Sequence, residues 1–196
     1  MIRQKGFTLV ELLIVISLLG VLAAAVLAAI NPLEQANRAR DTRFRSDASQ
    51  LLAATDRYFV AQDKFPWVTS GDVTTNDGQY GFISAQAAGV GICALAGCTG
   101  AANDGYLITN NELKTEFRNR DFVKATADTE MLYIGKATGA SSSVYACWVP
   151  KSKSERQKAT RTLTVGTPTL GTTTTVDCAA RTYADLATSC VVCLPQ

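Results

Sequence analysis

The spacing of apolar residues divides the chain into two parts. From Leu12 to Ile30 every residue is Leu, Ile, Val or Ala except Ser17 and Gly20, so this stretch of 19 residues is apolar on all sides. That length is close to the ~20 residues with which a helix crosses the hydrocarbon of a bilayer. Beyond Ile30 the sequence becomes polar and rich in Thr, Ala and Gly. The pattern predicts a membrane-spanning helix followed by a head domain outside the hydrocarbon.

Residues 33–62 have the spacing of an amphipathic helix. Pro32 precedes them, and it either kinks one long helix near residues 28–31 or ends one helix and starts another. Read as one helix, residues 7–60 would extend over about 80 Å. The helix is expected to end at Pro66. Its apolar stripe contains Phe44, Ala48, Leu51, Leu52, Thr55, Tyr58 and Phe59, and its polar face carries Arg43, Arg45, Asp47, Gln50 and Asp56.

The head reads as a small antiparallel sheet with long loops. Residues 130–138 and 143–150 are rich in β-formers and flank a Gly-containing loop, so they predict a hairpin. Residues 161–166 and 172–178 are candidate further strands. The expected fold class is α+β: a long N-terminal α-helix, comprising a membrane span and an amphipathic half, packed on a small antiparallel β-sheet.

Less regular structure is expected elsewhere in the head. Residues 68–111 are rich in Gly, Asn, Asp and Thr and predict a variable loop, with a helical turn near residues 84–88. Residues 111–122 predict one short helix, and the charged residues 151–161 predict a solvent-exposed connection.

Composition removes several classes of function. The chain has no histidine, which excludes Ser-His-Asp and Cys-His catalysis and histidine-ligated metal sites. Lys and Arg number 19 against 17 Asp and Glu, a net charge of +2, so no wide basic surface for nucleic acid is expected. The sequence therefore indicates neither an enzyme nor a cofactor site.

Glu11 interrupts the apolar N-terminal segment. A carboxylate at mid-bilayer costs roughly 2.5–3.5 kcal/mol and usually marks a partner. If the chain is cut between Gly6 and Phe7, the new amine of Phe7 lies four positions from Glu11 on the same helical face. That amine can pair with Glu11 of the same subunit or of a neighbouring one. Two other interpretations of the segment are a secretory signal peptide cleaved near residues 23–29 and an uncleaved signal anchor.

The sequence KGFTLVELLIVI, residues 5–16, resembles the cleavage and methylation motif of type IV pilins and type II secretion pseudopilins. Gly6 matches the family's processing glycine, Phe7 its N-methylated residue and Glu11 its assembly glutamate. The resemblance implies cleavage and methylation by a prepilin peptidase, followed by polymerisation through the N-terminal helix with the help of a pilus assembly platform. Glu11 and the Phe7 amine would then set the register of the polymer.

On this resemblance the chain comprises a cytoplasmic leader, a transmembrane and assembly helix, the amphipathic half of the spine and a globular head, at residues 1–6, 7–30, 31–62 and 63–196. The sheet would occupy about residues 130–178, before a Cys-rich tail. The implied function is a structural subunit of a type IV pilus-like filament. The alternatives are a subunit of a type II secretion pseudopilus or DNA-uptake filament and, from another class, a signal-anchored extracytoplasmic binding domain.

The resemblance also implies where the chain resides. The precursor would lie in the inner membrane with its N-terminus in the cytoplasm and its head outside, before entering an extracellular pilus or periplasmic filament. A count of flanking charges alone, Arg3 and Lys5 against four arginines at 38–45, gives the opposite orientation. Those arginines are interleaved with Glu34, Asp41 and Asp47, which predicts a solvated helix face or ion pairs between subunits rather than nucleic-acid binding.

Six cysteines, all after residue 90, are disulfide candidates in an oxidising compartment. Six thiols permit 15 connectivities, so the pairing stays open. A zinc site built from the two close pairs is the alternative. Asp72, Asp77 and Asp104 are oxygen ligands that suit calcium, but without the D-x-D-x-D-G pattern we expect solvated carboxylates and no metal site. The six cysteines are Cys93, Cys98, Cys147, Cys178, Cys190 and Cys193.

Overall fold

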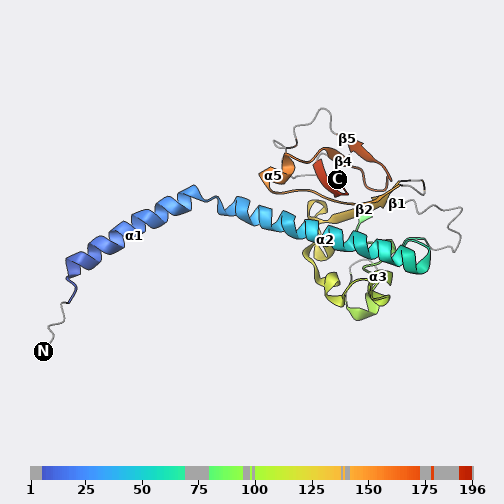
Figure 1. Cartoon of the computed structure of the whole chain (residues 1–196), viewed down its shortest axis with the longest axis horizontal. Helices are drawn as coiled ribbons and strands as arrows, with labels where there is room; N and C mark the ends of the chain where they lie inside the picture. The colour runs from blue at the N-terminus through green and yellow to red at the C-terminus, as the bar shows by residue number, and fades with distance from the viewer. Residues whose placement is uncertain are drawn as a thin grey trace. The chain divides into compact units, whose positions relative to one another are not determined.

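The computed structural model forms two compact units, residues 1–36 and 37–196 (Figure 1). The structure describes residues 6–68, 80–94, 98, 100–137, 139, 142–172, 178 and 190–195.

The first unit is built on helix α1, Leu9–Ala29. Leu and Ala are strong helix formers, and they make up more than half of this helix, which contains no proline and a single glycine. Within the described part of the chain, one helix is long and apolar enough to cross a membrane, and it runs over Leu9–Leu27. None of that stretch is buried against other parts of the protein, so its apolar surface has no partner within the chain.

The break after α1 has a local cause. Ile30 is extended, and Asn31 accepts a hydrogen bond from the amide of Glu34 at 3.2 Å, as a capping residue does. Pro32 takes the first position of helix α2, Pro32–Gln62, where the missing proline N–H costs nothing. The continuous helix considered for residues 7–60 is therefore interrupted at Ile30 and Asn31.

The head contains an antiparallel sheet in which strands that are neighbours in space are not always consecutive in sequence. Among the described residues the strand order is β1-β2-β3-β6-β4-β5. Strands β2 and β3 pair directly, which confirms the predicted hairpin. The last strand of the chain, β6, lies between β3 and β4 and joins the two halves of the sheet. The strands are β1 Tyr80–Ser84, β2 Leu132–Lys136, β3 Val144–Trp148, β4 Arg161–Leu163, β5 Leu170–Thr172 and β6 Cys190–Leu194.

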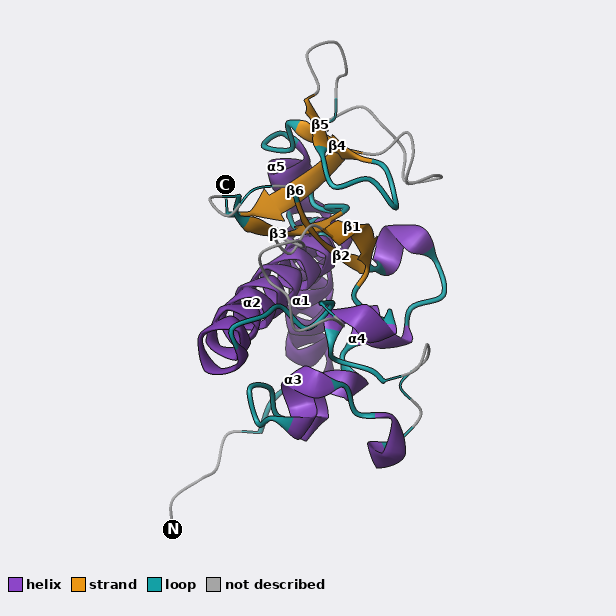
Figure 2. Ribbon diagram, turned by 90° about the vertical axis from the view of Figure 1, so that its right-hand side faces the viewer, coloured by secondary structure: helices purple, strands orange, loops and turns teal. Residues whose placement is uncertain are grey.

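The core lies mainly between α2 and the sheet. Leu132 and Ile134 point to the face that packs with α2, whereas Tyr133 points to the opposite face, as the period of two in a strand requires. Figures 1 and 2 both show α2 between the sheet and the segment that carries α3, Tyr106–Thr109, and α4, Asp121–Lys124. The ring of Phe44 on α2 meets that of Phe122 edge-on, 6.1 Å between centroids. The helix is thus covered on two sides.

In the described part of the head, four short 3-10 helices and one further α-helix connect these elements. The α-helix is α5, Lys153–Arg156, between β3 and β4. The 3-10 helices span Ala88–Val90, Ala101–Asn103, Thr115–Asn119 and Asp128–Glu130.

Several sequence-based expectations for the head were wrong. The segment 68–111 contains strand β1 at the edge of the sheet, because Tyr80 and Ile83 pair with β2 residues far along the chain. Residues 111–122 form a 3-10 helix and the start of α4 instead of one helix. The sheet extends beyond 130–178, since it includes β1 and β6. Strand β5 lies at Leu170–Thr172, and the expected strand residues 173–177 lie outside the described residues.

Candidate functional site

The residues assigned to processing lie in an extended segment before α1. Phe7 is 86% exposed, and a side chain at Gly6 would have open space around it. A peptide bond that a peptidase must reach needs exposed, non-helical backbone. The structure therefore leaves the Gly6–Phe7 bond accessible, while Arg3 and Lys5 lie outside the described residues.

Glu11 closes the N-terminus of its own helix. Its carboxylate Oε2 accepts hydrogen bonds from the amide and the hydroxyl of Thr8, both at 2.9 Å, and its own amide donates to the Thr8 hydroxyl at 3.2 Å. This is a capping box, in which each of two otherwise unpaired amides donates to the side-chain oxygen of the other residue. The T-x-x-E spacing is visible in the sequence but was not used in the sequence-based interpretation. Capping turns the carboxylate toward the end of α1 that carries Phe7.

The remainder of α1 holds one other polar side chain, and it too is satisfied. The hydroxyl of Ser17 donates to the carbonyl of Leu13 at 2.8 Å. With this bond made, α1 presents lipid or neighbouring helices with apolar surface and a single carboxylate near its N-terminus.

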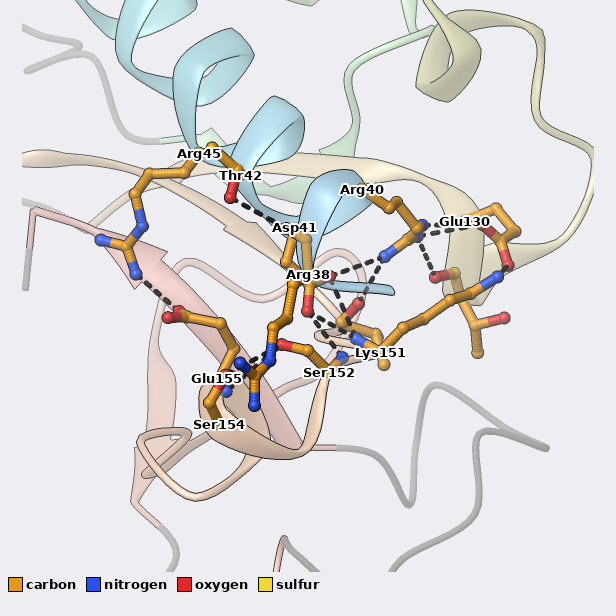
Figure 3. Close-up of polar contacts among 12 residues, drawn as sticks. Arg38, Arg40, Asp41, Thr42, Arg45, Glu130, Lys151, Ser152, Ser154 and Glu155 are labelled. Carbon is orange, nitrogen blue, oxygen red and sulfur yellow. Dashed lines mark hydrogen bonds and ion pairs between the residues drawn. The ribbon is translucent and has the colours of Figure 1, made fainter. Parts of the chain in front are cut away.

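In the head, a buried carboxylate on α2 anchors a distant loop (Figure 3). Asp41 is 2% exposed. Both of its carboxylate oxygens accept a hydrogen bond from the amide of Lys151, each at 3.0 Å. Its Oδ2 also accepts a hydrogen bond from the amide of Ser152 at 2.7 Å. The segment 151–161, expected to be a solvated connection, is therefore tied to α2 at its start. Asp41 itself, expected on a solvated face, is part of the interior.

Arg40 extends this cluster. Its guanidinium donates to Glu130 at 3.1 Å, to the carbonyl of Val149 at 3.1 Å and to Asp41 at 3.2 Å. Lys151 also pairs with Glu130. Burial raises the pKa of Glu130, but the hydrogen bonds and charges of Lys151 and Arg40 lower it by more. The pKa of this carboxyl is therefore below its ordinary value.

Other arginines of α2 also find partners inside the chain. Arg45 donates to Glu155 of α5 at 2.6 Å, and Arg43 lies 3.5 Å from Asp121 in an exposed pair. Arg120 lies 3.5 Å from Asp47, which is buried instead of lying on the polar face. Burial raises the pKa of Asp47, an effect that the charge of Arg120 opposes. Arg45 thus pairs within the head, whereas the exposed Arg43 pair fits the solvated face expected from the sequence, and pairing between subunits stays a prediction.

All six cysteines form disulfides: Cys93 with Cys98, Cys147 with Cys193, and Cys178 with Cys190. A thiolate zinc site is incompatible with this pairing. Cys147 and Cys193 are directly opposite one another on β3 and β6, so the bond ties the C-terminal strand to the hairpin. Of the calcium candidates, Asp104 pairs with Arg118, and Asp72 and Asp77 lie outside the described residues.

Two comparisons with known proteins find a match. The family model described as the prokaryotic N-terminal methylation motif matches residues 1–27. The chain is also similar to a protein of Klebsiella pneumoniae named type II secretion system core protein G, with 35% identity over 86 residues, which cover 44% of this chain and 55% of the relative. The chain thus spans about half the length of the curated relative that it matches. No solved structure matches it significantly.

Proposed function

The chain belongs to the family of type IV pilins and type II secretion pseudopilins, and we propose that it is a structural subunit which polymerises through α1 into a pilus-like filament. The family is one of structural proteins, and we propose no enzymatic activity for this member. A prepilin peptidase removes residues 1–6 by cutting after Gly6 and methylates the amine of Phe7. The precursor lies in the inner membrane, with its head outside, until an assembly platform extracts it.

The observation that carries the proposal is the surface of α1. Its large apolar side chains are exposed, and none of its membrane-length stretch is buried in the chain. Such a helix leaves a bilayer only if other apolar surface replaces the lipid, and copies of the same helix supply that surface. Once Arg3 and Lys5 are removed, the subunit has 17 basic and 17 acidic residues. Stacked subunits therefore have no net charge with which to repel each other.

Glu11 supplies the register in this proposal. A helix with apolar surface all round can slide along its neighbours, whereas one carboxylate fixes the axial position at which a cation must lie. The Phe7 amine of a neighbouring subunit is that cation. The capping box with Thr8 keeps the carboxylate hydrogen-bonded before assembly and holds it near the helix end, where the amines are.

The test replaces Glu11 by Leu and, as a matched control on the same helix, Ser17 by Ala. We expect Glu11→Leu to insert in the membrane and to be cleaved, while the yield of sheared filaments falls at least tenfold. Ser17→Ala should assemble normally, because its hydroxyl is bonded within its own helix. Normal filament yield for Glu11→Leu would refute the register role.

The intact mass of filament protein should correspond to a chain that begins at Phe7 and carries one methyl group. A start at Met1 or after residues 23–29 would refute the filament proposal.

A type II secretion pseudopilus is the second candidate, because the matched relative from Klebsiella pneumoniae is a secretion core protein. The two candidates differ in phenotype. Deleting a pilus subunit removes surface filaments and leaves secreted enzymes unchanged, whereas deleting a pseudopilin leaves those enzymes in the periplasm. Measuring both in one deletion strain separates them.

A further inference from the structure

Basic side chains gather where α2 enters the head. Arg38 and Arg45 come from α2, and four more come from the segment that starts at the Asp41 anchor. Figure 3 shows Arg38 on the same side of the cluster as Ser154 and Glu155. We call these residues the basic patch: Arg38, Arg45, Lys151, Lys153, Arg156 and Lys158.

Among the described residues, the region around the patch holds more cations than carboxylates. Together with the more buried Arg40 there are seven cations, and the described carboxylates of the region are four: Asp41, Glu130 and Glu155, which bond to members of the cluster, and Glu34, one helical turn before Arg38. Arg38, Lys153 and Lys158 are exposed. The net positive charge of this region exceeds that of the remainder of the head, because the head as a whole is close to neutral.

A hollow suited to a phosphate group adjoins the patch. Lys158, Thr160 and Arg161 line one side of a depression of about 260 Å³, and the remainder of its lining is Val191, Val192 and Cys193 of β6. Two cations and a hydroxyl are the donors with which proteins hold phosphate oxygens. The region therefore combines excess charge with a concave, donor-lined surface.

The chain itself limits the distance from this patch to the membrane. Arg38 follows Ala29, the end of α1, by nine residues, and the last seven of them, from Pro32 onward, belong to α2. The six steps from Pro32 to Arg38 rise about 9 Å, and the three steps from Ala29 to Pro32 cover at most ~10 Å, in whatever direction α2 points. The headgroup layer is itself about 5–7 Å deep. The backbone of Arg38 thus lies at most about 12–14 Å beyond the headgroup layer, which is less than two decay lengths, of about 8 Å each, of the surface potential of the bilayer.

We propose that the basic patch binds the phosphates of anionic lipid headgroups in the leaflet from which the head emerges. This inference rests on the proposed insertion of α1 in a membrane. Each Lys or Arg near an anionic surface contributes roughly fivefold to binding, so several together hold the head against the bilayer before assembly. Extraction of the subunit must then release these contacts.

The test uses the full chain inserted in lipid nanodiscs made of phosphatidylcholine alone, or with about one-third phosphatidylglycerol. Lysines are acetylated briefly and the rates are read by mass spectrometry. We expect Lys151, Lys153 and Lys158 to react at least about threefold more slowly in the anionic discs, and high salt to remove this protection. Lys114 and Lys124, elsewhere on the head, are internal controls. Equal rates in the two lipids, or equal protection of the controls, would overturn the proposal.

Paired variants sharpen the test. Arg38→Gln with Lys158→Gln removes two cations of the patch and should remove most of the protection at Lys151 and Lys153. Arg57→Gln with Lys114→Gln removes two cations far from the patch and should change nothing there. If both variants lower the protection equally, general charge and not the patch is responsible, and the assignment is wrong.

Two further arms identify the source of the phosphate. Short duplex DNA, or inorganic phosphate alone, is added to discs of pure phosphatidylcholine. Slower acetylation of the same three lysines by DNA would assign the patch to nucleic acid, and by phosphate to a free anion, and either result overturns the membrane assignment. The measurement needs an inserted subunit and no filament, so it is independent of the Glu11→Leu experiment.

Discussion

Asp41 holds the backbone amide of Ser152 at 2.7 Å, although 111 residues separate them in the sequence. The carboxylate is buried, and charge-assisted bonds of this kind are about twice as strong as neutral ones. The contact fixes the connection between β3 and α5 on the helix that leads to the membrane span. It also places the lysines of the basic patch beside the arginines of α2.

Replacing Asp41 by Ala should lower the free energy of unfolding by about 3 kcal/mol, because the buried amide of Ser152 and the partly buried amide of Lys151 lose their acceptor. Asp41→Asn keeps one acceptor oxygen and should lose less. Urea unfolding of the full chain in detergent, followed by tryptophan fluorescence, measures the change. Asp56→Ala, on the exposed face of the same helix, should stay within about 0.5 kcal/mol. A loss no larger for Asp41→Ala than for this control would refute the anchoring role.

The three disulfides should contribute unequally. In the chain-entropy model a disulfide stabilises more when it closes a longer loop. The separation is 46 residues for Cys147–Cys193, 12 for Cys178–Cys190 and 5 for Cys93–Cys98. Replacing each pair by alanines should therefore cost about 4, 3 and 2 kcal/mol in that order. Thermal unfolding of the three double variants gives the ranking, and a reversed order would show that native packing outweighs loop closure here.

Acid should weaken the head through Glu155. Burial raises the pKa of this carboxyl, but the hydrogen bonds and charges of Arg45 and Lys158 lower it further than burial raises it. Because its pKa is lower in the folded than in the unfolded chain, its pairing stabilises the head above the unfolded pKa, about 4.3. That stability is lost as the pH falls through the folded pKa.

The variant Arg45→Gln tests this pH dependence. It should lower the free energy of unfolding slightly at pH 7, by less than about 1 kcal/mol, and hardly at all near pH 3. Arg57→Gln, which removes an exposed arginine from a different ion pair, is the control. If Arg45→Gln costs as much in acid as at neutral pH, the Arg45–Glu155 pair is not the source of the pH dependence.

Gly135 of β2 has no room for a side chain. A Cβ at this position would lie 2.7 Å from the ring of Phe82 on the neighbouring strand β1. Gly135→Ala should therefore destabilise the head by about 1–3 kcal/mol through overpacking. The double variant Gly135→Ala with Phe82→Leu should recover part of the loss. Gly100→Ala is the control for backbone strain, because Gly100 has a positive φ but open space around it. Failure of the double variant to recover stability would point to the backbone of β2 and not to the ring.

Features that depend on residues close together along the chain can be predicted from the amino-acid order. The apolar run of α1, the amphipathic stripe on α2 and the two β-forming segments of the β2–β3 hairpin are all local patterns, and the structure has all three. The motif around Glu11 needs only fixed spacing along the chain, which is why it was visible without a structure. The exposed fraction of Phe59 shows the limit of such patterns, because this stripe residue remains 36% exposed.

Contacts between residues that are distant in the sequence could be identified only in the folded structure. The pairing of Cys147 with Cys193, the pairing of β6 with β3 and the burial of Asp41 all depend on contacts between segments about 45 to 110 residues apart. The sequence around a polar residue of a helix is the same whether its side chain bonds to water or to a buried amide. The buried arrangement is stable only in the folded protein, because burying a carboxylate costs free energy unless hydrogen-bond donors from other segments lie within reach of it.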